Sequence, residues 1–247
     1  MYPLAHLYFM ELFIKEPDDA AILGSIFPDI AILCGLEWRA SHSLGELIRR
    51  QFRHGGEVKD HFSLGVMSHG IEPKGLDYYS DVKFGVFERG YCYEKARPLV
   101  DVVIEALHVT PEDGWWKAHN FIEMGVELYV YKQRPELFAK LRAAFSNAGL
   151  MNSLAYDLSP LLNIGADVLL SCFERFKRFA VTEPIDAETM AFRYQRQIYF
   201  RHSIESINVS QTSNIIEEGE RIILLDIEDF FHCVEGRMAL IWPAFSD

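Results

Sequence analysis

The sequence predicts an all-α protein, a multi-helix bundle, from three observations. Apolar residues recur at helical spacing over most of the 247 residues, and 49% of all residues are hydrophobic, which is ample for a large core. Only residues 222–225 could form a strand, and their acidic flanks fit a helix equally well. No segment repeats with a period of about 20 to 50 residues, as a repeat protein would require. We therefore expect a single all-α domain over residues 1–247.

Two helices are expected at the start of the chain. Residues 3–15 carry apolar side chains at helical spacing and end near Pro17, which places His6 on the first helix. A second, short helix follows Asp18 or Asp19, because either carboxylate can cap a helix by accepting from a backbone N–H of its first turn.

Two candidate site residues, Asp29 and His42, are expected near the end of this second helix and the start of the next one. We expect Gly24 or Pro28 to end the second helix, so that Asp29 follows directly after it. Ser41 is a candidate N-cap for a third helix, which would place His42 at the start of that helix.

The rest of the chain is expected to be helical apart from one loop. A helix over residues 59–69 ends at His69, and the glycines, proline and aromatic cluster of residues 70–89 indicate an ordered loop. Apolar spacing predicts further helices over residues 93–107, 112–131, 135–145, 150–179, 186–207 and from 217 onwards. Polar clusters are concentrated before residue 130, so we expect the site there and a helical C-terminal part over residues 150–247.

The strongest local motif lies in the helix predicted over residues 112–131. His119 and Glu123 are four residues apart and therefore share one helix face, with Glu127 one turn further along. An imidazole and a carboxylate stacked in this way offer a nitrogen and an oxygen at a spacing that a divalent cation can bridge. The alternative is an ordinary helical His–Glu pair without a metal.

Further candidate ligands are concentrated in the first half of the chain. Seven of the nine histidines fall there, and six of them are candidates: His6, His42, His54, His61, His69 and His119. The candidate carboxylates before residue 130 are Asp29, Asp60, Glu72, Asp77, Asp81, Glu123 and Glu127. Helical bundles hold metal ions with inward-facing His and carboxylate groups from several helices. We therefore expect a metal site built from residues 1–130.

Charge and cysteine content narrow the class of protein. The net charge of −12 argues against a surface that coats nucleic acid, because that affinity is carried mainly by Lys and Arg, although bound cations could take a phosphate locally. The cysteines, Cys34, Cys92, Cys172 and Cys233, are scattered, as expected of buried thiols in a reducing compartment. No signal peptide and no transmembrane run of about 18 apolar residues is found, so we expect a cytoplasmic protein.

Four short motifs stand in the same order as in a known family. They are Leu-Gly-Ser-Ile-Phe-Pro-Asp at 23–29, His42, Gly-Val-Met-Ser-His-Gly at 65–70 and His-Asn-Phe-Ile-Glu at 119–123. Together they resemble the zinc-dependent phospholipase C family of bacterial phospholipases C and alpha-toxins, to which the single-strand-specific fungal nucleases are similar in fold. The resemblance implies an all-α fold around up to three zinc ions. It also implies hydrolysis of a phosphodiester or phosphomonoester by metal-bound hydroxide.

The resemblance implies a set of metal ligands as well. Its members are His6, Asp29, His42, His69, His119 and Glu123. Asp29 would also lie near the attacking water, which makes it the candidate catalytic residue. The family usually has a metal-bridging aspartate four residues after the histidine that His69 matches, but Pro73 stands there, so Asp77 or Asp81 would take that role. A further histidine of the family pattern is absent, which favours one or two metals over three.

These observations lead to one functional expectation with two alternatives. We expect a metal-dependent hydrolase of phosphate esters, with phospholipase C-like activity on a phosphate-ester small molecule or a phospholipid head group. Zinc is the first choice for a mixed imidazole and carboxylate site, and iron, manganese or nickel would suit the same ligands. The alternatives are a non-catalytic relative that keeps its metal, and a helical interaction protein whose histidines bind none.

Overall fold

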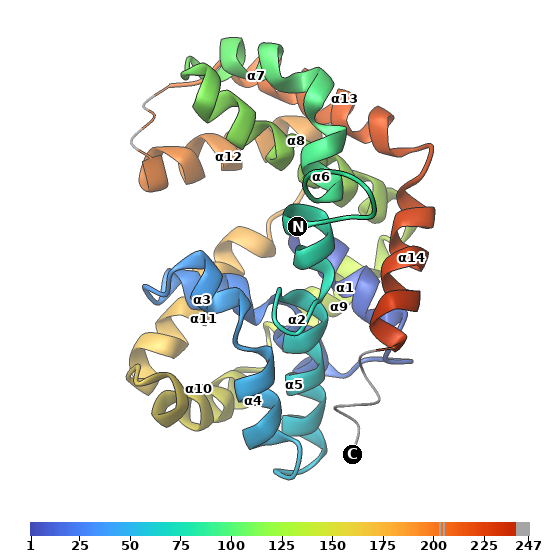
Figure 1. Ribbon diagram of the computed structural model, residues 1–247. Helices are drawn as coiled ribbons and strands as arrows, with labels where there is room; N and C mark the ends of the chain where they lie inside the picture. The colour runs from blue at the N-terminus through green and yellow to red at the C-terminus, as the bar shows by residue number, and fades with distance from the viewer. Residues whose placement is uncertain (203, 205, 241–247) are drawn as a thin grey trace. The chain divides into compact units, whose positions relative to one another are not determined.

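The structure is a computed structural model that describes residues 1–202, 204 and 206–240 (Figure 1). Helices make up 75% of it, and no strand occurs in the described part of the chain. The all-α, multi-helix fold expected from the sequence is therefore confirmed. None of the helices described combines the length and the apolar character that crossing a membrane requires.

The chain divides into two compact units, each assembled from separate segments. Unit 1 contains Met1–Tyr2, Tyr79–Arg134 and Thr182–Phe230. Unit 2 contains Pro3–Tyr78, Pro135–Val181 and Phe231–Asp247. The single domain expected over residues 1–247 stays a prediction, and its last residues, 241–247, lie outside the described part of the chain.

Unit 2 is built around two helices that cross closely. Its helices are α1 (Pro3–Glu11), α2 (Asp19–Leu33), α3 (Trp38–His42), α4 (Gly45–Phe52), α5 (Glu57–His69), α9 (Glu136–Ala144), α10 (Ala148–Leu162) and α11 (Ala166–Ala180). A Cβ on Gly24 of α2 would lie 2.1 Å from the carbonyl oxygen of Phe62 in α5, so only glycine permits this backbone approach. The Phe27 ring of α2 contacts those of Phe62 and Phe173, with centroids 5.3 and 5.9 Å away.

Unit 1 contains a second close crossing, between α8 and α13. Its elements are α6 (Tyr91–Lys95), the 3-10 turn η2 (Arg97–Leu99), α7 (Val100–Leu107), α8 (Pro111–Gln133), α12 (Ala187–His202) and α13 (Val209–Ile223). The π-helical turn η1 (Tyr78–Val82) and α14 (Ile227–Ala239) span the boundaries of the units. A Cβ on Gly125 would lie 2.4 Å from Glu220 N, and one on Gly219 would lie 2.5 Å from Phe121 O. Glycine therefore lets these two backbones touch.

The predicted end of the second helix is wrong, because α2 continues through Pro28 to Leu33. Asp18 does cap α2, and its carboxylate accepts from Ala21 N at 2.8 Å. Proline cannot donate to the carbonyl of Gly24 and normally breaks a helix. Here the buried packing of α2 against α5 outweighs that local cost, and Asp29 consequently lies inside the helix.

Other predicted boundaries shift for local reasons. His42 ends α3 and does not open a helix, because Ser41 donates its hydroxyl to Trp38 O at 2.8 Å and caps no N-terminus. Pro98 lies in η2 and separates α6 from α7 within the helix expected over 93–107.

Asn163, with left-handed backbone at φ 54°, ends α10 and divides the expected helix 150–179. Residues 222–225 are not a strand, since α13 continues to Ile223.

Candidate metal centre

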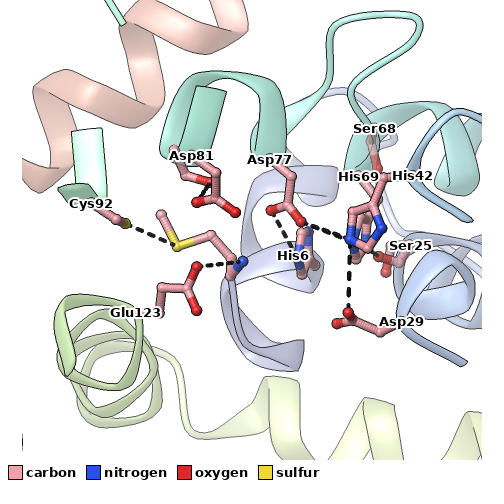
Figure 2. Close-up of polar contacts among 12 residues, drawn as sticks. His6, Ser25, Asp29, His42, Ser68, His69, Asp77, Asp81, Cys92 and Glu123 are labelled. Atoms are coloured by element: carbon pink, nitrogen blue, oxygen red, sulfur yellow. Dashed lines mark hydrogen bonds and ion pairs between the residues drawn. The ribbon is translucent and has the colours of Figure 1, made fainter. Parts of the chain in front are cut away.

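Five predicted ligands come together in unit 2, as Figure 2 shows. They are His6, Asp29, His42, His69 and Asp77. Their sources are α1, α2, the last residue of α3, the last residue of α5 and the segment before η1. All are buried except Asp29, whose side chain is 24% exposed.

The carboxylate of Asp77 is the centre on which three imidazoles converge. Its Oδ1 lies 3.4 Å from Nε2 of His6, and its Oδ2 lies 3.1 Å from Nε2 of His42 and 3.2 Å from Nε2 of His69. Nε2 of His42 is also 3.8 Å from Oδ1 of Asp29. None of the three Nε2 atoms makes a hydrogen bond, although all are buried. Buried polar atoms normally find partners, so this arrangement needs an explanation.

Backbone carbonyls fix the protonation of two of these rings. Nδ1 of His69 lies 2.7 Å from Ser25 O, and Nδ1 of His42 lies 2.9 Å from Trp38 O. A carbonyl oxygen only accepts, so an Nδ1 that bonds it carries a proton, and Nε2 then has a lone pair whenever the ring is neutral. Nδ1 of His42 is also 2.8 Å from the hydroxyl oxygen of Ser41. Both lone pairs therefore face a carboxylate, an arrangement that is repulsive unless a positive charge lies between them. In metal sites, the ring nitrogen that does not bind the metal commonly donates to a carbonyl in the same way, which orients the ring.

Burial and mutual proximity set the charges of the cluster. Burial lowers the pKa of His6 well below its ordinary value of 6.5, and the neighbouring His69 lowers it further, because their rings are stacked with centroids 3.5 Å apart. Burial alone would raise the pKa of Asp77, but the positive charge of the N-terminal amino group and then the imidazoles of His6, His69 and His42 hold it well below its usual range. A neutral His6 and an ionised Asp77 are the forms that bind a cation.

The spacing of the donor atoms fits a bound cation. Ligand atoms at about 2.0–2.1 Å from one tetrahedral ion lie about 3.3 Å apart, close to the separations around Asp77. Two groups have their ligand atoms all within 4.8 Å of one another, His6 with Asp29 and His69, and His42 with His69 and Asp77. Unit 2 therefore contains two groups of His and Asp residues that could hold a metal ion, and His69 belongs to each group.

The geometry also distinguishes the two aspartates that sequence reasoning left open. Asp77 lies with the histidines, whereas Asp81 belongs to unit 1. A tight turn returns the chain to α5 before Asp77, because Gly75 N donates to Gly70 O at 2.9 Å. A Cβ on Gly75 would lie 2.6 Å from two carbonyl oxygens at the end of α5, so this return requires glycine. Spacing from Pro73 alone did not indicate this fold-back.

The remaining predicted pair, His119 and Glu123, lies on α8 in unit 1. His119 donates from Nδ1 to Trp116 O, and its Nε2 accepts from Nδ2 of Asn120 at 3.1 Å. The ring stacks on Tyr93 with centroids 4.1 Å apart, and burial lowers its pKa, which favours the neutral form. The lone pair of His119 is thus directed at an amide donor, and its role as a metal ligand stays a prediction.

A further group in unit 1 was not anticipated. Asp81, Cys92 and Glu123 have ligand atoms within 4.8 Å of one another. Sequence reasoning missed Cys92 because no second cysteine stands near it to form a recognisable metal-binding spacing. The structure forms no disulfide among Cys34, Cys92, Cys172 and Cys233.

Comparisons with known proteins identify no relative. A scan against protein-family models, a search of curated proteins and a search of solved structures find no match. The resemblance to the zinc-dependent phospholipase C family therefore stays a prediction carried by short motifs. Function has to be inferred from the residues of the site.

Proposed function

We propose that this protein is a metal-dependent hydrolase of phosphate esters, with phospholipase C-like chemistry at the unit 2 cluster. The observation that carries the proposal is the convergence of three imidazole Nε2 atoms on the buried carboxylate of Asp77, beside the partly exposed Asp29. Zinc is the cation we expect first, because imidazole and carboxylate donors together suit it well. Iron, nickel and manganese suit the same donors.

The residues of the cluster divide into holding and reacting groups. His6, His42, His69 and Asp77 are buried and would hold the cation. A bound divalent cation lowers the pKa of water and polarises a phosphoryl oxygen. Asp29 is the member that water reaches, with 24% of its side chain exposed. Its carboxylate is therefore the group proposed to take the proton of the attacking water, as general-base catalysis requires.

The charge of the cluster favours an anionic substrate despite the acidic chain. The net charge of −12 would repel a phosphate from most of the surface. Within the cluster the protein contributes two carboxylates, Asp29 and Asp77, and two divalent cations would outweigh them. Trp38, which stacks on His42 with centroids 4.7 Å apart and is 40% exposed, offers an aromatic surface for the organic part of an ester. This combination supports a phosphate-ester small molecule or a phospholipid head group.

The test combines metal content with hydrolysis. The tag-free protein is stripped with a chelator, reloaded with zinc, iron, nickel or manganese, and analysed for metal per chain. Activity is then measured on bis(4-nitrophenyl) phosphate, 4-nitrophenyl phosphate and 4-nitrophenylphosphocholine. We expect one or two ions per chain and hydrolysis that chelation abolishes and metal restores. Absence of metal binding would overturn the proposal, and metal binding without hydrolysis of any ester would indicate a non-catalytic metal protein.

Asp29→Asn tests the catalytic assignment separately from metal binding. The amide keeps the size of the side chain and one oxygen donor, and four other ligands remain. We expect metal content near that of the wild type and turnover lower by about 10²–10⁴-fold. Full turnover in this variant would contradict the role of Asp29. His54→Ala, which changes an exposed histidine, is the matched control and should leave both quantities unchanged.

A further inference from the structure

We propose that unit 1 contains a separate cation site, formed by Asp81, Cys92 and Glu123, that takes a thiolate-binding divalent cation such as zinc. Their ligand atoms lie within 4.8 Å of one another (Figure 2). Cys92 is fully buried and Glu123 is 6% exposed, while Asp81 is half-buried. This site goes beyond the proposed function, because it shares no residue with the unit 2 cluster and adds a sulfur donor that the cluster lacks.

The fold brings these three residues together through close backbone contacts. A Cβ on Gly90 would lie 2.2 Å from Ser80 O and 2.3 Å from Asp81 N, so the start of α6 lies directly against η1. Phe84 N also donates to Arg89 O at 3.1 Å, which closes the loop between the two elements. Asp81 is thereby held beside α6, where Cys92 is located.

A ring contact holds α6 against α8, the helix that carries Glu123. The Tyr93 ring stacks on that of His119, with an angle of 18° between the rings. Asn120 accepts from the buried hydroxyl of Tyr194 at 3.1 Å, which fixes its amide. Its Nδ2 then lies 3.4 Å from Oε2 of Glu123, within reach of the carboxylate it would orient.

A positive charge already lies at this place in the structure. The amino group of Met1 is 3.2 Å from Oε1 of Glu123, and both groups are buried. This contact shows that the buried carboxylate of Glu123 holds a cationic group, whose place a divalent cation would take. The thioether of Met1 is 3.9 Å from Sγ of Cys92, so a second soft atom lies beside the thiol.

The donor set predicts which cations the site selects. When a divalent cation binds, the Cys92 thiol releases its proton to solvent and the thiolate sulfur forms the new bond. Thiolate donors favour zinc and cobalt over magnesium and manganese, whereas the nitrogen and oxygen donors of unit 2 are less selective. His119 is not required, because its Nε2 already accepts from Asn120.

Cobalt titration tests this site separately from the unit 2 cluster. Co²⁺ is added to the reduced, metal-free protein under nitrogen, and the near-ultraviolet sulfur-to-cobalt charge-transfer band is recorded. Only a site with a cysteine ligand gives that band. We expect it in the wild type and in His69→Ala, which lacks a unit 2 ligand. Loss of the band in Cys92→Ser, with retention in Cys172→Ser, a matched buried cysteine of unit 2, would support the proposal.

Two outcomes would overturn it. One is cobalt binding without the band in the wild type, and the other is a band that persists in Cys92→Ser. X-ray absorption on the zinc-loaded wild type covers the case in which Cys92→Ser does not fold. We expect a zinc–sulfur distance of about 2.3 Å. A spectrum with only nitrogen and oxygen neighbours would overturn the site while leaving the unit 2 proposal intact.

Discussion

The histidines of the two units have similar burial and opposite surroundings. In unit 2, backbone carbonyls accept from Nδ1 of His42 and His69, and Nε2 of both rings faces the carboxylate of Asp77 without a hydrogen bond. In unit 1 a carbonyl also accepts from Nδ1 of His119, but Nε2 of this ring accepts from the amide of Asn120. In the first arrangement the Nε2 atoms have no hydrogen-bond donor, whereas in the second Nε2 has one. The two units therefore differ in what the second ring nitrogen of a buried histidine faces.

The comparison extends to the carboxylates. Asp77 lies 3.1 to 3.4 Å from the Nε2 atoms of His6, His42 and His69. Glu123 already pairs with the buried amino group of Met1 and lies near a thiol. A cation in unit 2 would bind Nε2 atoms that make no hydrogen bond, while one in unit 1 would have to displace the amino group of Met1 from Glu123. The two sites should consequently differ in both affinity and metal preference.

The largest effect is expected for His69→Ala, because His69 belongs to both ligand groups of unit 2. Changing residues that only orient a ligand typically weakens metal binding about 10–100-fold, so removing a shared ligand should weaken it by more than about 100-fold. The measurement is zinc affinity by competition with a chelator of known affinity. Helix content by circular dichroism should stay near that of the wild type.

His119→Ala is the matched comparison, since it also removes a buried imidazole. We expect its zinc affinity at the unit 2 cluster to stay near the wild-type value. Equal losses of zinc affinity in His69→Ala and His119→Ala would contradict the proposed difference between the two histidines and would support the ligand set that the family resemblance implies. A loss of zinc affinity confined to His69→Ala would support the proposed difference.

A smaller effect, on unit 1, is expected for Gly90→Ala. The new methyl group would lie 2.2–2.3 Å from the backbone of Ser80 and Asp81, so η1 and α6 must move apart. We expect a loss of about 1–3 kcal/mol in the free energy of unfolding, the range typical of overpacking. The sulfur-to-cobalt band should weaken as Asp81 moves from Cys92, while zinc binding by unit 2 stays unchanged.

Gly236→Ala provides the control for this substitution. Gly236 is an exposed position of α14, and a Cβ there meets no atom within 4 Å. Alanine in a helix interior is more favourable than glycine by about 0.5–1 kcal/mol, so this variant should be as stable as the wild type or more stable. Urea titrations followed by circular dichroism measure both variants. A fully stable Gly90→Ala protein would contradict the tight contact.

The fold class follows from apolar spacing, which is a local property, but helix ends depend on distant contacts. Asp18 was identified as a possible cap because its effect is confined to one turn. Pro28 misled because the packing that keeps α2 helical comes from α5, more than thirty residues further along. Local rules for proline give no weight to such packing.

The candidate site shows the same limit. The residue types His6, Asp29, His42 and His69 were predictable, since each is a metal-ligating type in a cluster of others. The choice between Asp77 and Asp81 was not, because it depends on a glycine turn at the end of α5. Cys92 was overlooked for a related reason. A single cysteine has no spacing to reveal it, and only the contact of η1 with α6 brings it to Asp81.

The smallest predicted effect is a loss of stability in mild acid for the metal-free protein. Burial lowers the pKa of His6 and His119 below the ordinary value of 6.5. Between the folded and the unfolded pKa of each, the unfolded chain binds more protons, so the free energy of unfolding falls as the pH drops from about 7 to 5. Each histidine contributes at most about 1.4 kcal/mol per pH unit. Asp77, whose pKa is also lowered, adds to the loss only below its ordinary value of 3.8.

Paired substitutions assign this pH dependence to the two units. The pKa of His6 is lowered further than that of His119, because the stacked His69 adds to burial, whereas burial of His119 is opposed by Glu123. His6→Asn should therefore flatten the stability curve between pH 7 and 5 more than His119→Asn does. Urea titrations of the metal-free proteins at pH 7 and pH 5 give the change in the free energy of unfolding between the two pH values. Because this change is taken within one variant, any stability that the substitution itself removes at pH 7 cancels. Equal flattening in the two variants would contradict the predicted difference between the pKa values of His6 and His119. A free energy of unfolding that rises towards acidic pH would contradict the lowered pKa of both histidines.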